Sequence, residues 1–290
     1  MNIEVPYITT KKKTNLISGA AVEQSVLHEI KDRYNLSGYV VELHLAYPNQ
    51  MTVRSLASEV SLRKKTKMLE AIGATSKVYA YPYGVSGDIF TQSVSGANRD
   101  QNTVGIIVQL PIPKYLQGTL GEIDPIKDID SINPNNYFWT TCATSEAALR
   151  LLEARSIGMK RIGLIGARGF VGRHIDRGIY RRGLGEVIAI DIGNSLLSLR
   201  FCETIVSAVG QPNLVKAKYL SRDGAYMGID IGNIRSDGQF CGDFEIENMD
   251  GLLKYVTPVP GGMGPLEMVI LAERIVQNAV DPTFHLDFLL

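Results

Sequence analysis

The sequence predicts an α/β protein of two domains, with a doubly wound parallel sheet in the C-terminal one. The chain has 290 residues, which is enough for two domains. Short apolar runs, which are typical of buried parallel strands, alternate with segments of helical periodicity. A glycine-rich segment at 166–172 separates one such run from a helix. We expect a first domain over residues 1–144 and a second over 145–290, with the last helix, at about 265–280, packing back on the first.

The composition is that of an ordinary α/β protein, with 45% hydrophobic and 21% charged residues. Thirty basic residues balance thirty acidic ones, so no net field attracts nucleic acid or an anionic membrane. The cysteines Cys142, Cys202 and Cys241 lie far apart and favour neither a disulfide framework nor a metal site. The first residues lack a secretory pattern, and no apolar run reaches the roughly 18 residues of a membrane span. We therefore expect a cytoplasmic protein that acts on a small molecule, with no nucleic-acid or membrane partner and no bound metal.

In the first half, residues 38–45 predict a strand, and residues 58–72 predict a helix whose apolar positions are interrupted by a basic run at 63–67. Gly73 follows where a helix end is expected. Residues 104–110 form an almost continuous apolar run, which indicates a buried parallel strand. Its polar residue, Gln109, lies at the carboxyl end, where open α/β sheets bind ligands.

The second half repeats the alternation of strands and helices. We expect helices at 145–155, 171–182 and 265–278, and strands at 161–165, 187–191, 204–209 and 225–230. This order predicts a Rossmann fold.

The glycine-rich turn follows a strand and opens a helix. Its glycines allow backbone N–H groups to approach a pyrophosphate at a helix N-terminus. The predicted dinucleotide-binding residues are therefore those of the turn, Gly166, Ala167, Arg168, Gly169, Phe170, Val171 and Gly172. A purely structural strand-to-helix turn is the alternative.

Two further segments favour a nicotinamide dinucleotide. Asp191 ends the next predicted strand, 19 residues beyond Gly172, where a carboxylate can accept hydrogen bonds from an adenosine ribose. A carboxylate there disfavours a 2′-phosphate, so NAD is preferred over NADP, although Arg168 could pair with that phosphate. Asp191 as a helix N-cap or solvated loop acid is the alternative. The small residues Ala208 and Gly210 would let a dinucleotide lie against the sheet edge, and ordinary turn formation explains them as well.

Five motifs follow one another along the chain in the order that a known family also shows. They are Gly-Ile-Ile-Val-Gln-Leu-Pro-Ile-Pro at 105–113, Asp-Pro-Ile-Lys-Asp-Ile-Asp at 124–130, Ile-Asp-Ile-Gly-Asn at 229–233, Gly-Asp at 242–243 and, as the clearest of them, Thr-Pro-Val-Pro-Gly-Gly-Met-Gly-Pro at 257–265. With them the chain resembles the bifunctional methylenetetrahydrofolate dehydrogenase/methenyltetrahydrofolate cyclohydrolase family. The resemblance covers about residues 61 to 278.

The resemblance implies an N-terminal catalytic domain, a C-terminal Rossmann domain and a homodimer. It also implies NAD(P)-dependent oxidation of 5,10-methylenetetrahydrofolate to the methenyl form, with hydrolysis to 10-formyltetrahydrofolate as a second activity. The implied catalytic residues are Lys65, Gln109 and Asp130. The implied substrate-binding residues are Ser61, Val108, Leu110, Pro260, Gly261, Gly262, Met263 and Gly264, and the cofactor site gains Ile192 and Asn233.

These residue types suit the chemistry. An enclosed lysine can exchange protons near neutral pH, a glutamine can hold it, and a carboxylate can accept paired hydrogen bonds from a pterin. Each has a plain alternative. Lys65 belongs to a basic run that is compatible with a solvated helix face, with Lys64 as its rival. Gln109 could cap a strand end, and Asp130 could form a turn.

The chain departs from the family pattern at positions that contact ligands. The family's tyrosine falls at Ser61, a family glycine is Ser131, a threonine is Glu267, and the glycine turn carries Ala167 and Arg168. Two other functions therefore stay open: a Rossmann oxidoreductase acting on a non-folate metabolite, and a non-catalytic binding protein on the same scaffold.

Overall fold

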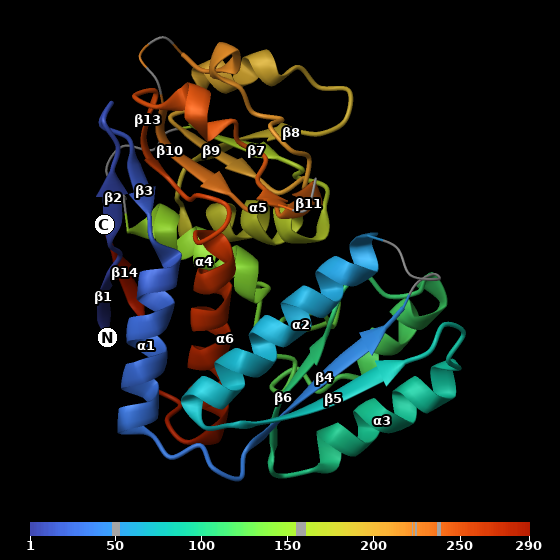
Figure 1. Cartoon of the computed structure of the whole chain (residues 1–290). Coiled ribbons are helices and arrows are strands. Elements are labelled where there is room, and N and C mark those ends of the chain that lie inside the picture. Colours follow the sequence, from blue (N-terminus) through green and yellow to red (C-terminus); the bar gives the residue numbers. More distant parts are fainter. Residues whose placement is uncertain (48–52, 155–160, 222, 224, 237–238) are drawn as a thin grey trace. The chain divides into compact units, whose positions relative to one another are not determined.

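The structure is a computed structural model that describes residues 1–47, 53–154, 161–221, 223, 225–236 and 239–290 (Figure 1). It forms two compact units. Unit 1 comprises Met1–Gln24, Thr144–Glu267 and Leu286–Leu290, and unit 2 comprises Ser25–Ala143 and Met268–His285. The first 24 residues thus group with the second half of the chain, whereas the sequence assigned them to the first domain.

Unit 1 is built on a seven-stranded sheet of order β2-β3-β13-β10-β9-β7-β8, parallel except for the β2–β3 pair. Its strands are β2 (Tyr7–Thr9), β3 (Asn15–Ile17), β7 (Arg161–Ile165), β8 (Glu186–Ile190), β9 (Thr204–Ser207), β10 (Ala225–Asp230) and β13 (Leu253–Val256). The remaining elements include two further strand pairs, β1 (Asn2–Glu4) with β14 (Asp287–Leu289) and β11 (Ile234–Ser236) with β12 (Gln239–Cys241), and the helices α4 (Ala143–Glu153), α5 (Phe170–Arg182), η2 (Leu196–Phe201), η3 (Ala217–Tyr219) and η4 (Ile246–Met249).

The strand order positions a ligand site in unit 1. Strand β7 has β8 on one side and β9 on the other, so the chain reverses its direction of travel across the sheet between β7 and β9 (Figure 1). Ligands of open α/β sheets bind outside the carboxyl ends of strands at such a reversal. Buried side chains from β7, β8 and β9, among them Ile165, Ile190 and Ile205, form the apolar core beneath these strand ends.

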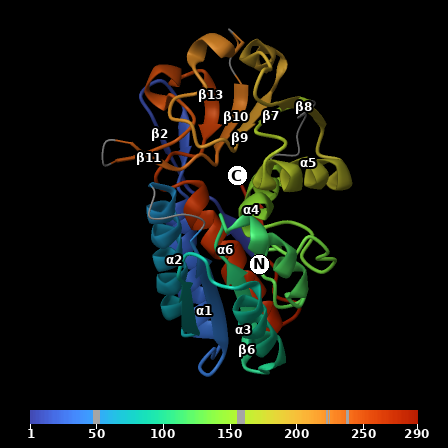
Figure 2. The ribbon, with the colours of Figure 1, turned by 90° about the vertical axis from the view of Figure 1, so that its right-hand side faces the viewer.

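Unit 2 is built on a three-stranded parallel sheet of order β5-β4-β6. The strands are β4 (Val40–Ala46), β5 (Thr75–Tyr81) and β6 (Thr103–Val108), and every residue of β4 and β6 is buried. The helices α2 (Val53–Ile72) and α3 (Gly87–Arg99) lie on either side of this sheet (Figures 1 and 2). The unit is completed by η1 (Lys114–Glu122), by α1 (Gly19–Arg33) from Ser25 on, and by α6 (Met263–Ala279) from Met268 on.

The predicted α/β class with parallel sheets is confirmed, and the observed elements are close to those expected. Strands β7 and β10 have the predicted bounds, and β8 ends at Ile190, so Asp191 is the first residue after the strand. The predicted helix at 145–155 begins at Ala143, and its expected last residue, 155, lies outside the described residues. In the described part of the chain, no helix is long and apolar enough to span a lipid bilayer.

Candidate functional site

Lys65 is a buried lysine on the inner face of α2. Its side chain is 2% exposed, whereas Lys64 and Lys67 are exposed. Met68, Leu69 and Ile72 are also buried, and their spacing from Lys65 puts all four on one helical face. The alternative that Lys65 lies on a solvated face is therefore wrong.

Three oxygen atoms surround the Lys65 amine. Its Nζ donates to Gln109 Oε1 at 3.1 Å and to Ser61 Oγ at 3.3 Å, and it lies 3.8 Å from Asp130 Oδ2. The structure thus brings together the three predicted catalytic residues and Ser61 within unit 2. A buried ammonium needs such partners, since an isolated charge out of water is costly.

The amide of Gln109 has a fixed orientation. Its Nε2 donates to the Leu110 carbonyl at 3.1 Å, which leaves Oε1 to face Lys65. The same carbonyl accepts a hydrogen bond from Ser58 Oγ at 3.2 Å, so α2 is tied to the segment after β6. Val108 precedes Gln109 and is buried in the sheet, paired with His44 of β4.

Asp130 follows a rigid loop. Its Oδ1 accepts from the Ala143 N–H at 3.1 Å, and its Oδ2 faces the Lys65 amine, so both carboxylate oxygens are engaged. The preceding Asp128 is fully buried and accepts from the N–H groups of Ile132 and Asn133. Burial raises the pKa of the Asp128 carboxyl, while these hydrogen bonds favour its ionised form.

Ser131 stands where the resembled family has glycine, and its backbone explains that preference. Its φ is 52°, in the left-handed region that is strained for a residue with a side chain. The Ser131 hydroxyl donates to the Trp139 carbonyl, and this bond offsets part of the strain.

The glycine turn in unit 1 is a close-packed cradle. Gly166 has φ of 82° and donates its N–H to the Ile190 carbonyl at 2.8 Å. A Cβ at Gly172 would lie 2.1 Å from the Gly166 oxygen and 2.9 Å from the Ala167 Cα, so no side chain fits there. Gly169 is the N-cap of α5, with a Cβ position 3.1 Å from the same oxygen. The α5 N-terminus therefore lies tightly against the turn, as backbone recognition of a pyrophosphate requires.

Asp191 and Arg168 form the side of this cradle. The Arg168 N–H donates to Asp191 Oδ1 at 3.2 Å, and Arg168 Nε lies 3.7 Å from Asp191 Oδ2. The Asp191 side chain is 17% exposed and that of Arg168 is 89% exposed. Asp191 is thus neither a helix N-cap nor a fully solvated acid, and Ile192 beside it is fully exposed.

The segment after β9 carries the other predicted cofactor residues. Ala208 donates its N–H to the Ile165 carbonyl at 3.0 Å, which brings it to the carboxyl end of β7 beside Gly166. Gly210 has φ of 71°. Asn233, which follows β10, is exposed.

Two buried carboxylates that the sequence did not reveal as functional hold these loops. Asp243 accepts from the Ser207 hydroxyl at 2.6 Å and from the N–H groups of Val209 (3.0 Å) and Gln211 (2.8 Å). Asp230 accepts from the N–H groups of Gly232, Asp243 and Phe244. Burial, with the nearby Asp243 charge, raises the pKa of Asp230 to about 7.

The two carboxylates also require glycine around them. A Cβ at Gly232 would lie 2.1 Å from Asp243 Oδ1, and one at Gly242 would lie 2.1 Å from Asp230 Oδ2. The two motifs, Gly-Asp at 242–243 and Asp-Ile-Gly at 230–232, therefore pack against each other. Together they hold the loop after β9.

We expect Asp243→Asn to destabilise unit 1 and to weaken dinucleotide binding. The amide keeps the volume of the carboxyl, but its NH₂ group would face the N–H of either Val209 or Gln211, and a buried donor left unpaired costs about 1–3 kcal/mol. Chemical denaturation gives the free energy of unfolding, and titration calorimetry gives the NAD(P) affinity. Asp176→Asn, on the exposed side of α5, is the matched control. An Asp243→Asn protein as stable as this control would contradict the assignment.

The proline–glycine segment at 258–264 belongs to unit 1. Gly261 has φ of 100° and accepts a hydrogen bond from the Ala20 N–H at 3.1 Å. A Cβ at Gly19 would lie 2.0 Å from the Gly262 oxygen, so the N-terminal segment packs directly on this loop. Pro260 and Met263 belong to the same segment, and Met263 is buried at the start of α6, followed by Gly264.

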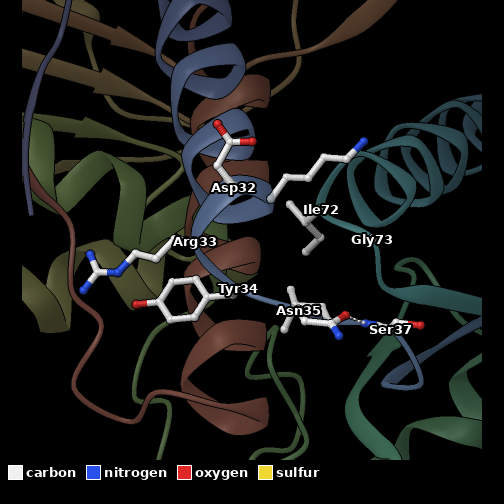
Figure 3. Close-up of a pocket in the computed structure, with 9 residues that line it drawn as sticks. Asp32, Arg33, Tyr34, Asn35, Ser37, Ile72 and Gly73 are labelled. Atoms are coloured by element: carbon white, nitrogen blue, oxygen red, sulfur yellow. Dashed lines mark hydrogen bonds between the residues drawn. The ribbon is translucent and has the colours of Figure 1, made fainter.

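A surface pocket of unit 2 holds none of the predicted site residues. It has a volume of about 480 Å³ and is lined by residues 31–37 at the end of α1, together with Ile72 and Gly73 (Figure 3). The Tyr34 hydroxyl donates to Asp281 at 2.6 Å, and Asn35 accepts from the Ser37 N–H. Both hydrogen bonds are made within the protein.

Comparison with known proteins agrees with this division of roles. Residues 17–130 match the catalytic domain of the tetrahydrofolate dehydrogenase/cyclohydrolase family, and residues 142–282 match its NAD(P)-binding domain. The bifunctional protein FolD of Lactobacillus acidophilus is 31% identical over 233 residues, which cover 76% of this chain and 82% of that protein. FolD of Thermus thermophilus is 28% identical over 278 residues, which cover 91% of this chain and 96% of that protein.

Solved structures show the same fold. The bifunctional methylenetetrahydrofolate dehydrogenase/cyclohydrolase of Campylobacter jejuni superposes with a TM-score of 0.79 at 26% identity, covering 91% of this chain and 98% of that one. The Trypanosoma brucei enzyme, solved with NADP and an inhibitor, gives 0.79 at 23% identity, covering 93% and 97%. The chain therefore belongs to the tetrahydrofolate dehydrogenase/cyclohydrolase family, with that family's catalytic domain in its first half and its NAD(P)-binding domain in its second.

Proposed function

We propose that this enzyme oxidises 5,10-methylenetetrahydrofolate to the methenyl form with NAD(P) and then hydrolyses that product to 10-formyltetrahydrofolate. The observation that carries the proposal is the buried Lys65 amine, held by Gln109 Oε1 and Asp130 Oδ2. A buried amine is costly, and one held by polar partners in a catalytic-domain fold is suited to proton transfer.

In this proposal Lys65 moves protons during hydrolysis. As the neutral amine, it accepts a proton from the water that adds to the methenyl carbon. It then returns the proton to the folate nitrogen as that carbon–nitrogen bond breaks, while the added hydroxyl releases its own proton to solvent and becomes the carbonyl of the formyl group on the other nitrogen. Gln109 orients the amine, because its own amide is fixed by the Leu110 carbonyl. Asp130 supplies the carboxylate that accepts from the pterin.

The glycine turn of unit 1 fits a dinucleotide. Gly172 leaves no room for a Cβ, and the α5 N-terminus supplies free N–H groups for a pyrophosphate. When bound there, the dinucleotide would supply a nicotinamide ring that accepts a hydride from the methylene carbon. The walls of this site are backbone or small side chains, from Gly166, Ala208 and Gly210.

Purified protein tests the proposal directly. With 5,10-methylenetetrahydrofolate and NAD or NADP, we expect the absorbance of both the methenyl product and the reduced cofactor to rise. Methenyltetrahydrofolate alone should lose its absorbance faster than in buffer. Folded protein that turns over neither substrate with either cofactor would overturn the proposal. A homodimer, which the family also suggests, is tested by sedimentation of the same protein.

We further propose that the enzyme prefers NAD. Asp191 presents a carboxylate next to the turn, and the Arg168 guanidinium is already near that carboxylate. A 2′-phosphate would meet a like charge there, whereas a 2′-hydroxyl would donate to it.

Asp191→Ser should therefore shift the ratio of kcat/KM values toward NADP by about 10-fold or more, since it removes the like charge and releases Arg168. Adding Arg168→Ala to that variant should remove the part of the gain that comes from the guanidinium and leave the part that comes from the lost like charge. Kinetics with both cofactors measure the ratio. An unchanged ratio in Asp191→Ser would refute the preference.

One observation favours a second substrate class. Ser61 replaces the family's tyrosine, so the aromatic surface expected for a folate ring is missing at that position. Calorimetry that detects nicotinamide binding but no folate binding would support an oxidoreductase acting on another metabolite.

A further inference from the structure

Ser61 is the departure from the family pattern that lies closest to the proposed chemistry. It precedes Lys65 by one helical turn on α2, so the two side chains lie on one face. Ser61 is half-buried, and its Oγ lies 3.3 Å from Lys65 Nζ. Whatever replaces the tyrosine's contact with substrate, the hydroxyl in this structure is directed at the catalytic amine.

The partners of Lys65 differ in what they can donate. Gln109 presents its carbonyl Oε1, because its NH₂ group donates to Leu110. Asp130, the charged group next to the amine, can only accept when ionised. Ser61 has a hydroxyl that both donates and accepts. Among these three partners, Ser61 alone can therefore offer a proton to the lone pair of a neutral amine.

This difference matters because Lys65 must exist in two states. As an ammonium it has three N–H donors and donates to Gln109 Oε1 and Ser61 Oγ, with Asp130 Oδ2 3.8 Å away as the countercharge. As a neutral amine it keeps two N–H donors and can still donate to Gln109 Oε1, and its lone pair can accept the Ser61 O–H. Rotation of one hydroxyl thus serves both states without moving a heavy atom.

We propose that Ser61 is a positioning residue that stabilises the neutral form of Lys65 by donating its hydroxyl hydrogen to the amine. When Lys65 takes the proton from water, the Ser61 hydroxyl turns and accepts from the new N–H. When Lys65 passes that proton to the folate nitrogen, the hydroxyl turns back. Ser61 neither gains nor loses a proton in the cycle. This inference rests on the proposed proton-transfer function of Lys65.

The first test measures the amine itself, without substrate. Protein labelled with ¹³C-lysine is titrated by NMR, with the Lys65 signal assigned by its loss in Lys65→Met. Ser61→Ala should move the Lys65 midpoint up by about one pH unit, because the ammonium keeps Gln109 Oε1 and the Asp130 charge, whereas the neutral amine loses the O–H that donates to its lone pair. Ser61→Thr, which keeps a hydroxyl, should leave the Lys65 midpoint at its value in the unchanged protein. Ser95→Ala, on α3 of the same unit, is the matched control, and the other lysine signals serve as internal references.

The second test measures cyclohydrolase kinetics against pH. Ser61→Ala should lower kcat near neutral pH by about 10-fold and move the acid limb of its pH profile upward, with little change in KM. Ser61→Thr should restore both. A raised KM with an unchanged pH profile would assign Ser61 to substrate contact and overturn the proposal, as would an unmoved Lys65 midpoint. If no folate substrate reacts, the proposed function fails on its own, and the NMR midpoint still decides the role of Ser61.

Discussion

Lys65→Met is expected to reduce cyclohydrolase turnover by about 1,000-fold, since a positioned acid–base group contributes roughly 10²–10⁴ to a rate. Methionine is similar in length and apolar, so it fills the same buried position but cannot carry a proton. Gln109 and Ser61 then lose their donor, and Asp130 loses its countercharge. The decay of methenyltetrahydrofolate absorbance measures the effect.

Lys64→Met is the control for this change. Lys64 is the next residue of α2 and is exposed, so its variant changes the same charge without touching the buried face. We expect it to retain turnover. A Lys65→Met protein with full activity in both reactions would show that the amine has no chemical role.

Gly172→Ala is expected to weaken NAD(P) binding by about 100-fold, because the turn must distort to fit a methyl group and the distortion costs a few kcal/mol. The added Cβ would meet backbone atoms of Gly166 and Ala167, which cannot rotate away as a side chain could. Fluorescence titration with reduced cofactor measures the affinity, and circular dichroism reports whether the protein is folded.

Two other glycines calibrate this prediction. Gly169→Ala should have a smaller effect, because its Cβ would lie 3.1 Å from the Gly166 oxygen. Gly96→Ala, on α3 with open space around its Cβ position, should leave binding unchanged. Equal affinities for the Gly172 and Gly96 variants would mean that the turn does not hold the dinucleotide.

The sequence predicted well those helices and strands that are specified by residues within or next to them. Apolar runs bounded by glycine or proline identified β6, β7 and β10, and the glycine turn identified the start of α5. The short strands β1 and β3 were missed because they are stabilised by distant partners, and β2 forms the sheet edge beside β3. β1 pairs with β14 at the other end of the chain, and β3 pairs with β13. No local pattern encodes such a pairing.

The candidate site was partly predictable for the same reason. The buried positions Met68, Leu69 and Ile72 stand three, four and seven residues after Lys65, so helical spacing alone could have separated Lys65 from Lys64. The roles of Asp230 and Asp243 could not be inferred in this way. Their donors lie on loops that only the folded sheet brings together.

The interleaving of the two units has a consequence for biosynthesis. The sheet of unit 1 needs β2 and β3 from the first residues, and unit 2 needs Met268–His285 from near the last (Figure 1). Neither unit is complete while the ribosome is still translating the middle of the message. Expression of residues 145–290 alone would leave β13 as an open sheet edge, which is a known hazard for aggregation. A nascent chain should therefore complete both units only when synthesis is nearly finished.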